Sequence, residues 1–266
     1  MTYKLIALDV DGTLITDDHR LTEPTRLMLQ KLHREGRTIV LCTGRGPMSA
    51  LPILEQLGFG SVLITHNGAL TLSSEGPTTI HQFSFRYEDI RPIIDYCRQK
   101  GIHFDINTAF EMYVEQMPEN AEEMYGKYFA MPQMAEHLDD MINEEWVKFT
   151  AFGPPEEMDR MEADLRRLYP ELARLRMIRS GVSFIDMMHK EATKGKALAQ
   201  YCKSADVKPE EVVAFGNYYN DVEMLQFAGL SYAVDNAPEE VKLAADRVTL
   251  SNNDDGVFAA LKALFQ

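Results

Sequence analysis

Through the first part of the chain, short apolar runs alternate with amphipathic stretches. Runs that are apolar throughout predict buried strands at residues 4–8, 38–42 and 61–65. The stretches between them predict two helices. Thr22 could cap the first and Gly36 ends it, and the second covers residues 48–57 and ends at Gly58. Strands and helices joined in this order by short connections are typical of a right-handed parallel α/β sheet.

Antiparallel signals replace this alternation in the middle of the chain. Helices are predicted at residues 87–100, 121–130 and 156–169, and strands at 102–107, 111–115, 146–152, 175–178 and 183–187. The first two and the last two strands form predicted hairpins, the second of which turns at Ser180-Gly181. This α+β arrangement predicts a separate module inserted into the α/β domain.

The α/β pattern resumes after His189. Further helices are predicted at residues 194–203, 222–227 and 256–264, and further strands at 212–215, 231–234 and 247–250. The predicted fold class is therefore α/β. Its parallel-sheet core is formed by residues 1–82 and 189–266, and an α+β domain is inserted at residues 83–188.

The charge balance bears on what the protein binds. The 266 residues include 27 Lys and Arg against 41 Asp and Glu, which gives a formal net charge of −14. Nucleic-acid backbones are bound by local excesses of basic side chains, so this balance argues against nucleic acid as a main partner. A small anionic substrate remains compatible with it, because one Lys and a few backbone N–H groups can hold a phosphate.

Cysteine usage and hydropathy favour a cytoplasmic protein. Cys42, Cys97 and Cys202 are far apart and odd in number, so no complete disulfide framework is expected and a reducing compartment fits best. No spaced Cys or His cluster predicts zinc. Asp9 interrupts the first apolar run too early for a signal peptide, and no apolar run approaches the roughly 20 residues of a membrane span, so no membrane partner is expected. The sequence does not predict the oligomeric state.

Two carboxylates, Asp9 and Asp11, follow the first predicted strand. A spacing of two on an extended segment puts both side chains on one side. Such a pair could bind a hard cation or divide the duties of nucleophile and acid/base, and Gly12 permits a sharp turn after it. A calcium loop is the competing interpretation, but its sixth and twelfth positions need Gly and Glu, where this chain has Leu14 and Arg20.

A second polar cluster follows the second predicted strand. Thr43, Gly44 and Arg45 could hold a phosphate through a hydroxyl, a backbone N–H and a guanidinium. A Thr at this place is also a common helix cap. The Gly44-Arg45-Gly46 segment resembles a dinucleotide loop only by chance, since Ser49 stands where that loop needs Gly or Ala.

Two more clusters lie near the end of the chain. Lys194 opens a predicted helix, where its charge opposes the helix dipole; this favours pairing with an anion, with a surface lysine as the alternative. Asn217 and Asp221 could both reach a metal site, and Asn220 could bind phosphate or orient a neighbour, with helix capping as the alternative for the two asparagines. Ligands of open α/β sheets bind beyond the carboxyl ends of the strands, so these residues and Asp9 are expected to converge.

The clusters together resemble a known family. Their order is Asp-Val-Asp-Gly-Thr at residues 9–13, Thr-Gly-Arg at 43–45, an inserted module, Lys-Gly at 194–195 and Gly-Asn-x-x-Asn-Asp at 216–221. This order, over the whole chain, resembles the haloacid dehalogenase superfamily of phosphatases, especially its Cof-type branch with an α/β cap. The resemblance implies a Rossmann-like core, a cap inserted between residues 67–69 and Lys194, and Mg²⁺-dependent hydrolysis of small phosphomonoesters such as sugar phosphates.

The resemblance also implies a role for each residue. Asp9 would attack phosphorus to form an aspartyl-phosphate, and Asp11 would protonate the leaving alcohol and then activate water. Magnesium would be held by the Asp9 carboxylate, the Asp11 backbone carbonyl and Asn217, with Asp221 supporting the metal site. The residues expected to bind the substrate phosphate are Thr43, Gly44, Arg45, Lys194 and Asn220.

One position departs from the family pattern, which commonly has Asp where this chain has Asn217. An amide oxygen can still bind magnesium but carries no charge, so we expect weaker magnesium affinity with the site geometry kept. A phosphomutase of the same superfamily and a non-catalytic phosphometabolite-binding or regulatory protein remain alternative functions. The cap is expected to set substrate choice, with residues 107–113 and 180–183 as candidate contributors.

Overall fold

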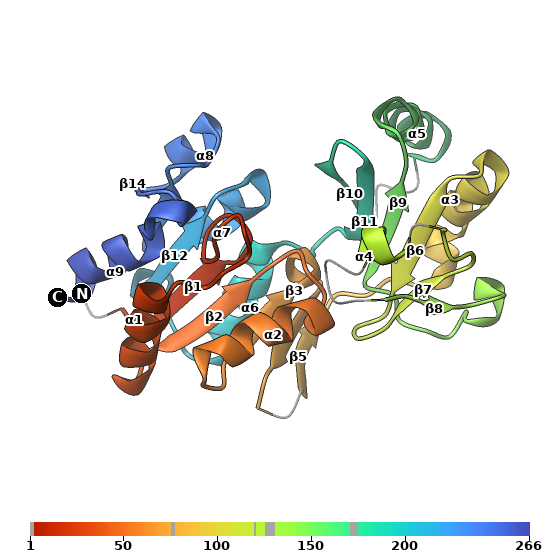
Figure 1. Ribbon diagram of the computed structural model, residues 1–266. Coiled ribbons are helices and arrows are strands. Elements are labelled where there is room, and N and C mark those ends of the chain that lie inside the picture. The colour runs from red at the N-terminus through yellow and green to blue at the C-terminus, as the bar shows by residue number, and fades with distance from the viewer. Residues whose placement is uncertain (1–2, 76–77, 120, 126–130, 171–174) are drawn as a thin grey trace. The chain divides into compact units, whose positions relative to one another are not determined.

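The chain forms two compact units in a computed structural model (Figure 1). One unit comprises Met1–His81 and Thr193–Gln266, and the other comprises Gln82–Ala192. The structure describes residues 3–75, 78–119, 121–125, 131–170 and 175–266. The expected boundaries were 82/83 and 188/189. The second falls after Ala192 because the last strand of the inserted unit runs to His189.

A sheet forms the centre of the first unit, with eight strands in the described residues in the order β14-β13-β12-β1-β2-β3-β4-β5. The strands are β1 (Leu5–Asp9), β2 (Thr38–Cys42), β3 (Val62–Thr65), β4 (Leu70–Ser73), β5 (Thr78–Gln82), β12 (Val212–Gly216), β13 (Leu230–Val234) and β14 (Arg247–Thr249). From β14 to β3 each neighbour pairs in parallel, as predicted.

Two strands of this sheet, β4 and β5, were missed by the sequence analysis. β4 runs antiparallel to β3 and follows it after one short turn. It has only four residues, too few to show a period, and β5 exposes its first three residues, so neither produced an apolar run. The predicted parallel core is therefore present, and an antiparallel strand, β4, extends it beyond β3.

Helices cover both faces of the sheet. They are α1 (Glu23–Arg34), α2 (Pro47–Leu57), α6 (Lys194–Ser204), α7 (Val222–Phe227), α8 (Glu239–Ala244) and α9 (Gly256–Phe265). Apolar side chains of α6, α7 and α8 pack on the face formed by alternate strand residues such as Leu5 and Ala7. On the opposite face α1 lies beside α2 and α9 (Figure 1). All residues of β1 and β12 are buried, as expected of central strands covered on both sides.

One predicted cap is wrong. Thr22 does precede α1, but its hydroxyl makes no capping bond and instead contacts the Asp255 carboxylate and the Thr25 hydroxyl. The six-residue helix α8 was not predicted; it begins directly after Pro238 and is too short for a helical period to show.

The second unit is a mainly antiparallel sheet in the order β10-β11-β9-β6-β7-β8. Its elements are α3 (Tyr87–Lys100), β6 (His103–Asn107), β7 (Met112–Val114), α4 (Ala121–Tyr125), β8 (Gln133–Met134), β9 (Lys148–Phe152), α5 (Pro155–Leu168), β10 (Leu175–Gly181) and β11 (Phe184–His189). Its core is formed by buried residues of α3, α5 and the strands between them, such as Ile94, Phe149 and Leu165.

Both predicted hairpins of this unit are present as antiparallel pairs, β6 with β7 and β10 with β11. The second one turns at Val182-Ser183 rather than at Ser180-Gly181, because β10 continues to Gly181. The helix expected at residues 121–130 covers Ala121–Tyr125, and its remainder lies outside the described residues. The two-residue strand β8 was not predicted.

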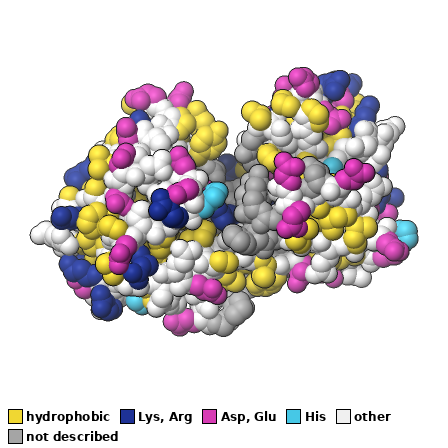
Figure 2. Space-filling view, viewed as in Figure 1, with side chains coloured by type: hydrophobic (Ala, Val, Ile, Leu, Met, Phe, Trp, Pro, Cys, Tyr) yellow, Lys and Arg dark blue, Asp and Glu magenta, His cyan; other side chains and the backbone are white. Residues whose placement is uncertain are grey.

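The surface charges and the hydropathy of the helices give little information about function. Acidic and basic side chains are interspersed over each unit on the face that Figure 2 shows. Within the described ranges, none of the helices combines the length and apolarity of a membrane span.

Candidate active site

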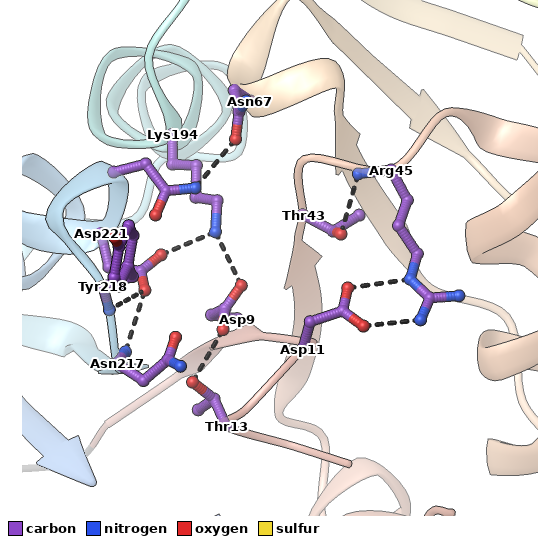
Figure 3. Close-up of polar contacts among 11 residues, drawn as sticks. Asp9, Asp11, Thr13, Thr43, Arg45, Asn67, Lys194, Asn217, Tyr218 and Asp221 are labelled. Atoms are coloured by element: carbon purple, nitrogen blue, oxygen red, sulfur yellow. Dashed lines mark hydrogen bonds and ion pairs between the residues drawn. The ribbon is translucent and has the colours of Figure 1, made fainter. Parts of the chain in front are cut away.

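The candidate residues of the first unit lie where neighbouring parallel strands end. In the sheet β12 pairs with β1, β1 with β2, and β2 with β3, all in parallel. Asp9 is the last residue of β1, Thr43 follows β2, Asn67 follows β3 and Asn217 follows β12. The carboxyl ends of parallel strands share one edge of a sheet, which is why these separate segments meet (Figure 3).

A buried lysine joins two carboxylates at this edge. The Nζ of Lys194 lies 2.7 Å from Oδ1 of Asp9 and 2.7 Å from Oδ1 of Asp221. The Lys194 side chain is 1% exposed, although Lys194 is the first residue of α6. The lysine is therefore no surface residue, and the anions expected from the dipole argument are these two aspartates.

Burial and charge perturb this trio. Burial raises the pKa of Asp9 to about 7, and the nearby charge of Asp221 adds to the increase, while Lys194 opposes it. For Lys194 burial disfavours the ammonium, but the two carboxylates outweigh it and raise the pKa above its usual value. The ammonium stays charged at neutral pH, whereas the Asp9 carboxyl can exchange a proton there. Such perturbed groups are typical of functional sites.

Asp221 also shapes the loop that follows β12. Its Oδ2 accepts the backbone N–H groups of Asn217, at 2.9 Å, and Tyr218, at 3.0 Å. A side chain on Gly216 would collide with Asp221, so the strand must end in glycine for this contact to form. Both oxygens of Asp221 are thus occupied by protein donors, and its direct effect is to hold Lys194 and the backbone of Asn217.

The turn after β1 brings Thr13 back to Asp9. Gly12 has φ +73°, a value that favours glycine, and a Cβ there would collide with the side chain of Asn217. The Thr13 hydroxyl donates to Oδ2 of Asp9 at 2.7 Å. Each oxygen of the Asp9 carboxylate therefore has one donor, which fixes the plane of the carboxylate. Thr13 ends the Asp-Val-Asp-Gly-Thr motif, but no role at the site was predicted for it.

Asp11 faces a different partner from Asp9. Its carboxylate receives both prongs of the Arg45 guanidinium, with Nε at 2.8 Å and Nη2 at 2.5 Å (Figure 3). Asp11 is 45% exposed at its side chain and Arg45 only 9%. A bidentate contact of this kind is geometrically specific. The sequence predicted Arg45 as a phosphate ligand and did not predict its pairing with Asp11.

Thr43 and Asn220 complete the cluster. The Thr43 hydroxyl accepts the backbone N–H of Arg45 at 3.1 Å and does not cap α2, whose N-cap position is Gly46. The Asn220 amide donates to Oδ1 of Asn67 at 2.9 Å. This contact is the kind that orientation of a neighbour, one of the roles predicted for Asn220, would need. Asn67 itself was not predicted as a site residue; the polar residues after the third strand were the signal.

The oxygen atoms available at this site are suitable ligands for magnesium. Within the described residues, no group of three or more His, Cys, Asp or Glu side chains is placed so that these side chains alone could hold a metal ion. Hard oxygens are nevertheless available from Asp9, from the backbone at Asp11 and from Asn217. The Asn217 side chain lies against the Gly12 turn and makes no hydrogen bond to the described residues. A half-buried amide left unpaired beside carboxylates is what an oxygen-preferring cation would use.

Comparison with known proteins gives similarity over the whole chain. A family model described as haloacid dehalogenase-like hydrolase matches residues 6–261. A Haemophilus influenzae protein named as a candidate phosphatase is 31% identical, with 100% of this chain and 99% of that protein covered. A Bacillus subtilis protein named 5-amino-6-(5-phospho-D-ribitylamino)uracil phosphatase is 27% identical over 97% and 94%. A Serratia proteamaculans protein named HMP-PP phosphatase is 29% identical over 90% and 86%.

Solved structures share the fold. TM0651 of Thermotoga maritima superposes with a TM-score of 0.91 at 27% identity, with 100% of this chain and 98% of that one covered. Another structure, with a TM-score of 0.80 and 26% identity over 99% of both chains, is described as showing conservation of a trigonal-bipyramidal intermediate in a phosphoryl-transfer superfamily.

Proposed function

The chain belongs to the haloacid dehalogenase-like hydrolases and is a phosphatase, and from this premise we propose that it hydrolyses small phosphomonoesters through an aspartyl-phosphate on Asp9, with Mg²⁺ as cofactor. The observation that carries the proposal is the buried Asp9 carboxylate, held in one orientation by Lys194 and Thr13. A fixed carboxylate beside a permanent positive charge is what an attack on a phosphate dianion requires.

The first step forms one bond and breaks one. An oxygen of Asp9 bonds to phosphorus, the bond from phosphorus to the ester oxygen breaks, and the leaving oxygen takes a proton from Asp11. Lys194 lies 2.7 Å from Asp9 and so stands beside the incoming phosphoryl group, whose charge it offsets. The Thr43 hydroxyl and the Gly44 N–H are the proposed donors to the other phosphoryl oxygens.

The second step returns the enzyme to its starting state. Water attacks phosphorus and gives a proton to Asp11, and the bond between Asp9 and phosphorus breaks to release phosphate. In the structure Asp11 is held by Arg45. Arg45 must therefore share or release this carboxylate if it is also to bind phosphate, so the substrate competes with Asp11 for one guanidinium. Asn220 has an indirect role in this proposal, since it orients the Asn67 side chain through their hydrogen bond.

Magnesium fits the same cluster. The Asp9 carboxylate, the Asp11 backbone carbonyl and the Asn217 amide oxygen would hold it, and Asp221 would support it by shaping the loop of Asn217. When bound, the ion would supply positive charge against the phosphoryl oxygens. Asn217 supplies no charge of its own, so we propose that the affinity for Mg²⁺ is weaker than with Asp at this position.

The substrate class is supported by the relatives. The Bacillus subtilis and Serratia proteamaculans proteins are both named for small phosphorylated metabolites. We propose a similar substrate here, such as a sugar phosphate, and a cytoplasmic location, because Cys42, Cys97 and Cys202 are all buried free thiols that a reducing compartment preserves.

A panel of phosphorylated sugars, nucleotides and cofactors tests the proposal. Purified protein is incubated with each compound, with p-nitrophenyl phosphate as a reference, in the presence of Mg²⁺ or EDTA. We expect release of inorganic phosphate that depends on Mg²⁺. An isomerised substrate without free phosphate would indicate a phosphomutase instead. Saturable binding without any turnover would indicate a binding or regulatory protein, and either result contradicts the proposal.

A further inference from the structure

The loop that carries Asp11 is only partly held by its own bonds. Three backbone N–H groups, of Thr13, Leu14 and Ile15, converge on the Val10 carbonyl at 3.3, 3.0 and 3.1 Å. This closes a tight turn, but it leaves the Gly12 carbonyl without an acceptor role inside the loop. That carbonyl belongs to the peptide group between Gly12 and Thr13, directly after the Asp11–Gly12 peptide group, so a bond to it restricts the conformations of the segment that carries Asp11.

An asparagine outside the four motifs binds this carbonyl. Asn236, which follows β13, donates its amide N–H to the Gly12 carbonyl at 2.8 Å. Its own Oδ1 accepts the backbone N–H of Asn252 at 3.1 Å. Both ends of the Asn236 amide are therefore used, which fixes the side chain between the Asp11 loop and the segment after β14.

Asn252 holds the far side of the same loop. It is 4% exposed, and its amide N–H₂ donates to the Ile15 carbonyl at 3.0 Å and to the Asp17 carboxylate at 2.9 Å. Its Oδ1 is buried and has no hydrogen-bond partner in the described structure. An unpaired buried oxygen is unfavourable. The Asn252 amide is nevertheless oriented so that its N–H₂ group donates to the loop. This indicates that the acceptors of the loop determine the orientation of the amide.

We propose that Asn236 is a positioning residue for the general acid/base Asp11, with Asn252 as its anchor. By holding the Gly12 carbonyl, Asn236 fixes the peptide group between Gly12 and Thr13, and through Gly12 it limits the positions of the Asp11 carboxylate. The proposal rests on the proposed function of Asp11. It adds a residue on a different segment, 224 positions away from the carbonyl it binds.

Two substitutions of one residue test this role. Asn236→Asp keeps an acceptor for the Asn252 N–H but cannot donate to Gly12, and Asn236→Ala loses both bonds. Asn253→Ala is the matched control. Asn253 bonds only to Asp17 at the end of the loop among the contacts described, through its amide at 2.9 Å and its Oδ1 at 3.1 Å.

The kinetic readout separates positioning from stability. A p-nitrophenolate leaving group needs little protonation, whereas the alkoxide of a sugar phosphate depends on a general acid. For both Asn236 variants we expect kcat on the fastest sugar phosphate of the panel to fall roughly tenfold to hundredfold, with a smaller fall on p-nitrophenyl phosphate and little change in KM. Asn253→Ala should keep the wild-type ratio of the two kcat values. Equal losses on both substrates, or no loss, would overturn the proposal.

Amide hydrogen exchange gives a second readout that does not depend on activity. In both Asn236 variants the amides of residues 11–15 should exchange about fivefold faster than in the wild type, while Asn253→Ala leaves them unchanged. Unchanged exchange in Asn236→Asp would refute the role of Asn236. If the wild type releases no phosphate from any compound, the proposed function fails, and the exchange comparison still decides whether Asn236 holds the loop.

Discussion

Replacing Lys194 with methionine removes the one charge that the buried carboxylates share. Each ion pair has a separation of 2.7 Å, which corresponds to about 6 kcal/mol at an effective dielectric constant near 20. Burial of the ammonium offsets much of this gain, so the sum is no measure of net stability. The loss of the lysine instead leaves Asp9 and Asp221 buried without a cation, and such a loss costs about 3–5 kcal/mol.

The pH dependence of the loss has a definite sign. The pKa of Asp9 is already raised from its ordinary value to about 7 in the folded protein, mainly by burial, so the folded state binds a proton at Asp9 more readily than the unfolded chain does. Lys194 opposes this increase in the pKa of Asp9, so without the lysine Asp9 binds a proton more readily still. The destabilisation in Lys194→Met should therefore be larger at pH 8 than at pH 5.5, where protonation removes the uncompensated charge.

Urea unfolding at the two pH values measures this effect. Lys203→Met is the control, because it removes the same charge from an exposed position of the same helix and should change the free energy of unfolding by well under about 1 kcal/mol. The double variant Lys194→Met/Asp221→Asn should recover part of the lost free energy of unfolding, since it leaves one buried carboxylate fewer without a cation. An equal effect of the two methionine substitutions, or a larger loss at pH 5.5, would refute the reasoning.

Three further predictions concern Arg45 and Asn217 in the candidate active site and Asp105 in the second unit. Arg45→Gln should lower kcat/KM for a sugar phosphate at least about tenfold and Arg45→Lys should not restore it, because lysine cannot make the bidentate contact to Asp11; wild-type rates in either variant would count against this. Asn217→Asp should tighten Mg²⁺ binding roughly tenfold in calorimetry, through one added charge, and an unchanged affinity would contradict the idea. Burial raises the pKa of Asp105 to about 7 from 3.8, so its share of stability should be lost as the pH rises from about 4 to 7. In urea unfolding, the free energy of unfolding of Asp105→Asn should not show this pH-dependent decrease. A pH profile parallel to that of the wild type would contradict the prediction.

The strand ends explain why much of the site was predictable. Apolar runs mark β1, β2, β3 and β12 in the sequence, and parallel pairing then brings their carboxyl ends together without any knowledge of side-chain contacts. Lys194 was recognisable because a lysine at a helix N-terminus opposes the dipole, and the structure places it against Asp9 and Asp221. The unfavourable position of this charge in the sequence thus indicated an anionic partner, but it did not identify the two aspartates.

Other features depend on contacts that local patterns do not record. The pairing of Arg45 with Asp11 is set by two side-chain conformations, and no spacing distinguishes an arginine that binds phosphate from one that binds a carboxylate. Asn236 and Asn252 lie outside every motif, and only the fold brings them to the loop after β1. The Thr22 hydroxyl donates to Asp255, far away in the sequence, and does not cap the adjacent helix α1.

The covalent intermediate on Asp9 is the claim on which the mechanism depends most directly. Enzyme quenched in acid during turnover of a sugar phosphate with Mg²⁺ can be reduced with borohydride, which converts an acyl phosphate at position 9 to homoserine, and then digested for peptide mass spectrometry. We expect the reduced peptide in the wild type, and neither that peptide nor turnover in Asp9→Asn. Turnover that persists in Asp9→Asn, or a modified residue other than Asp9, would contradict it.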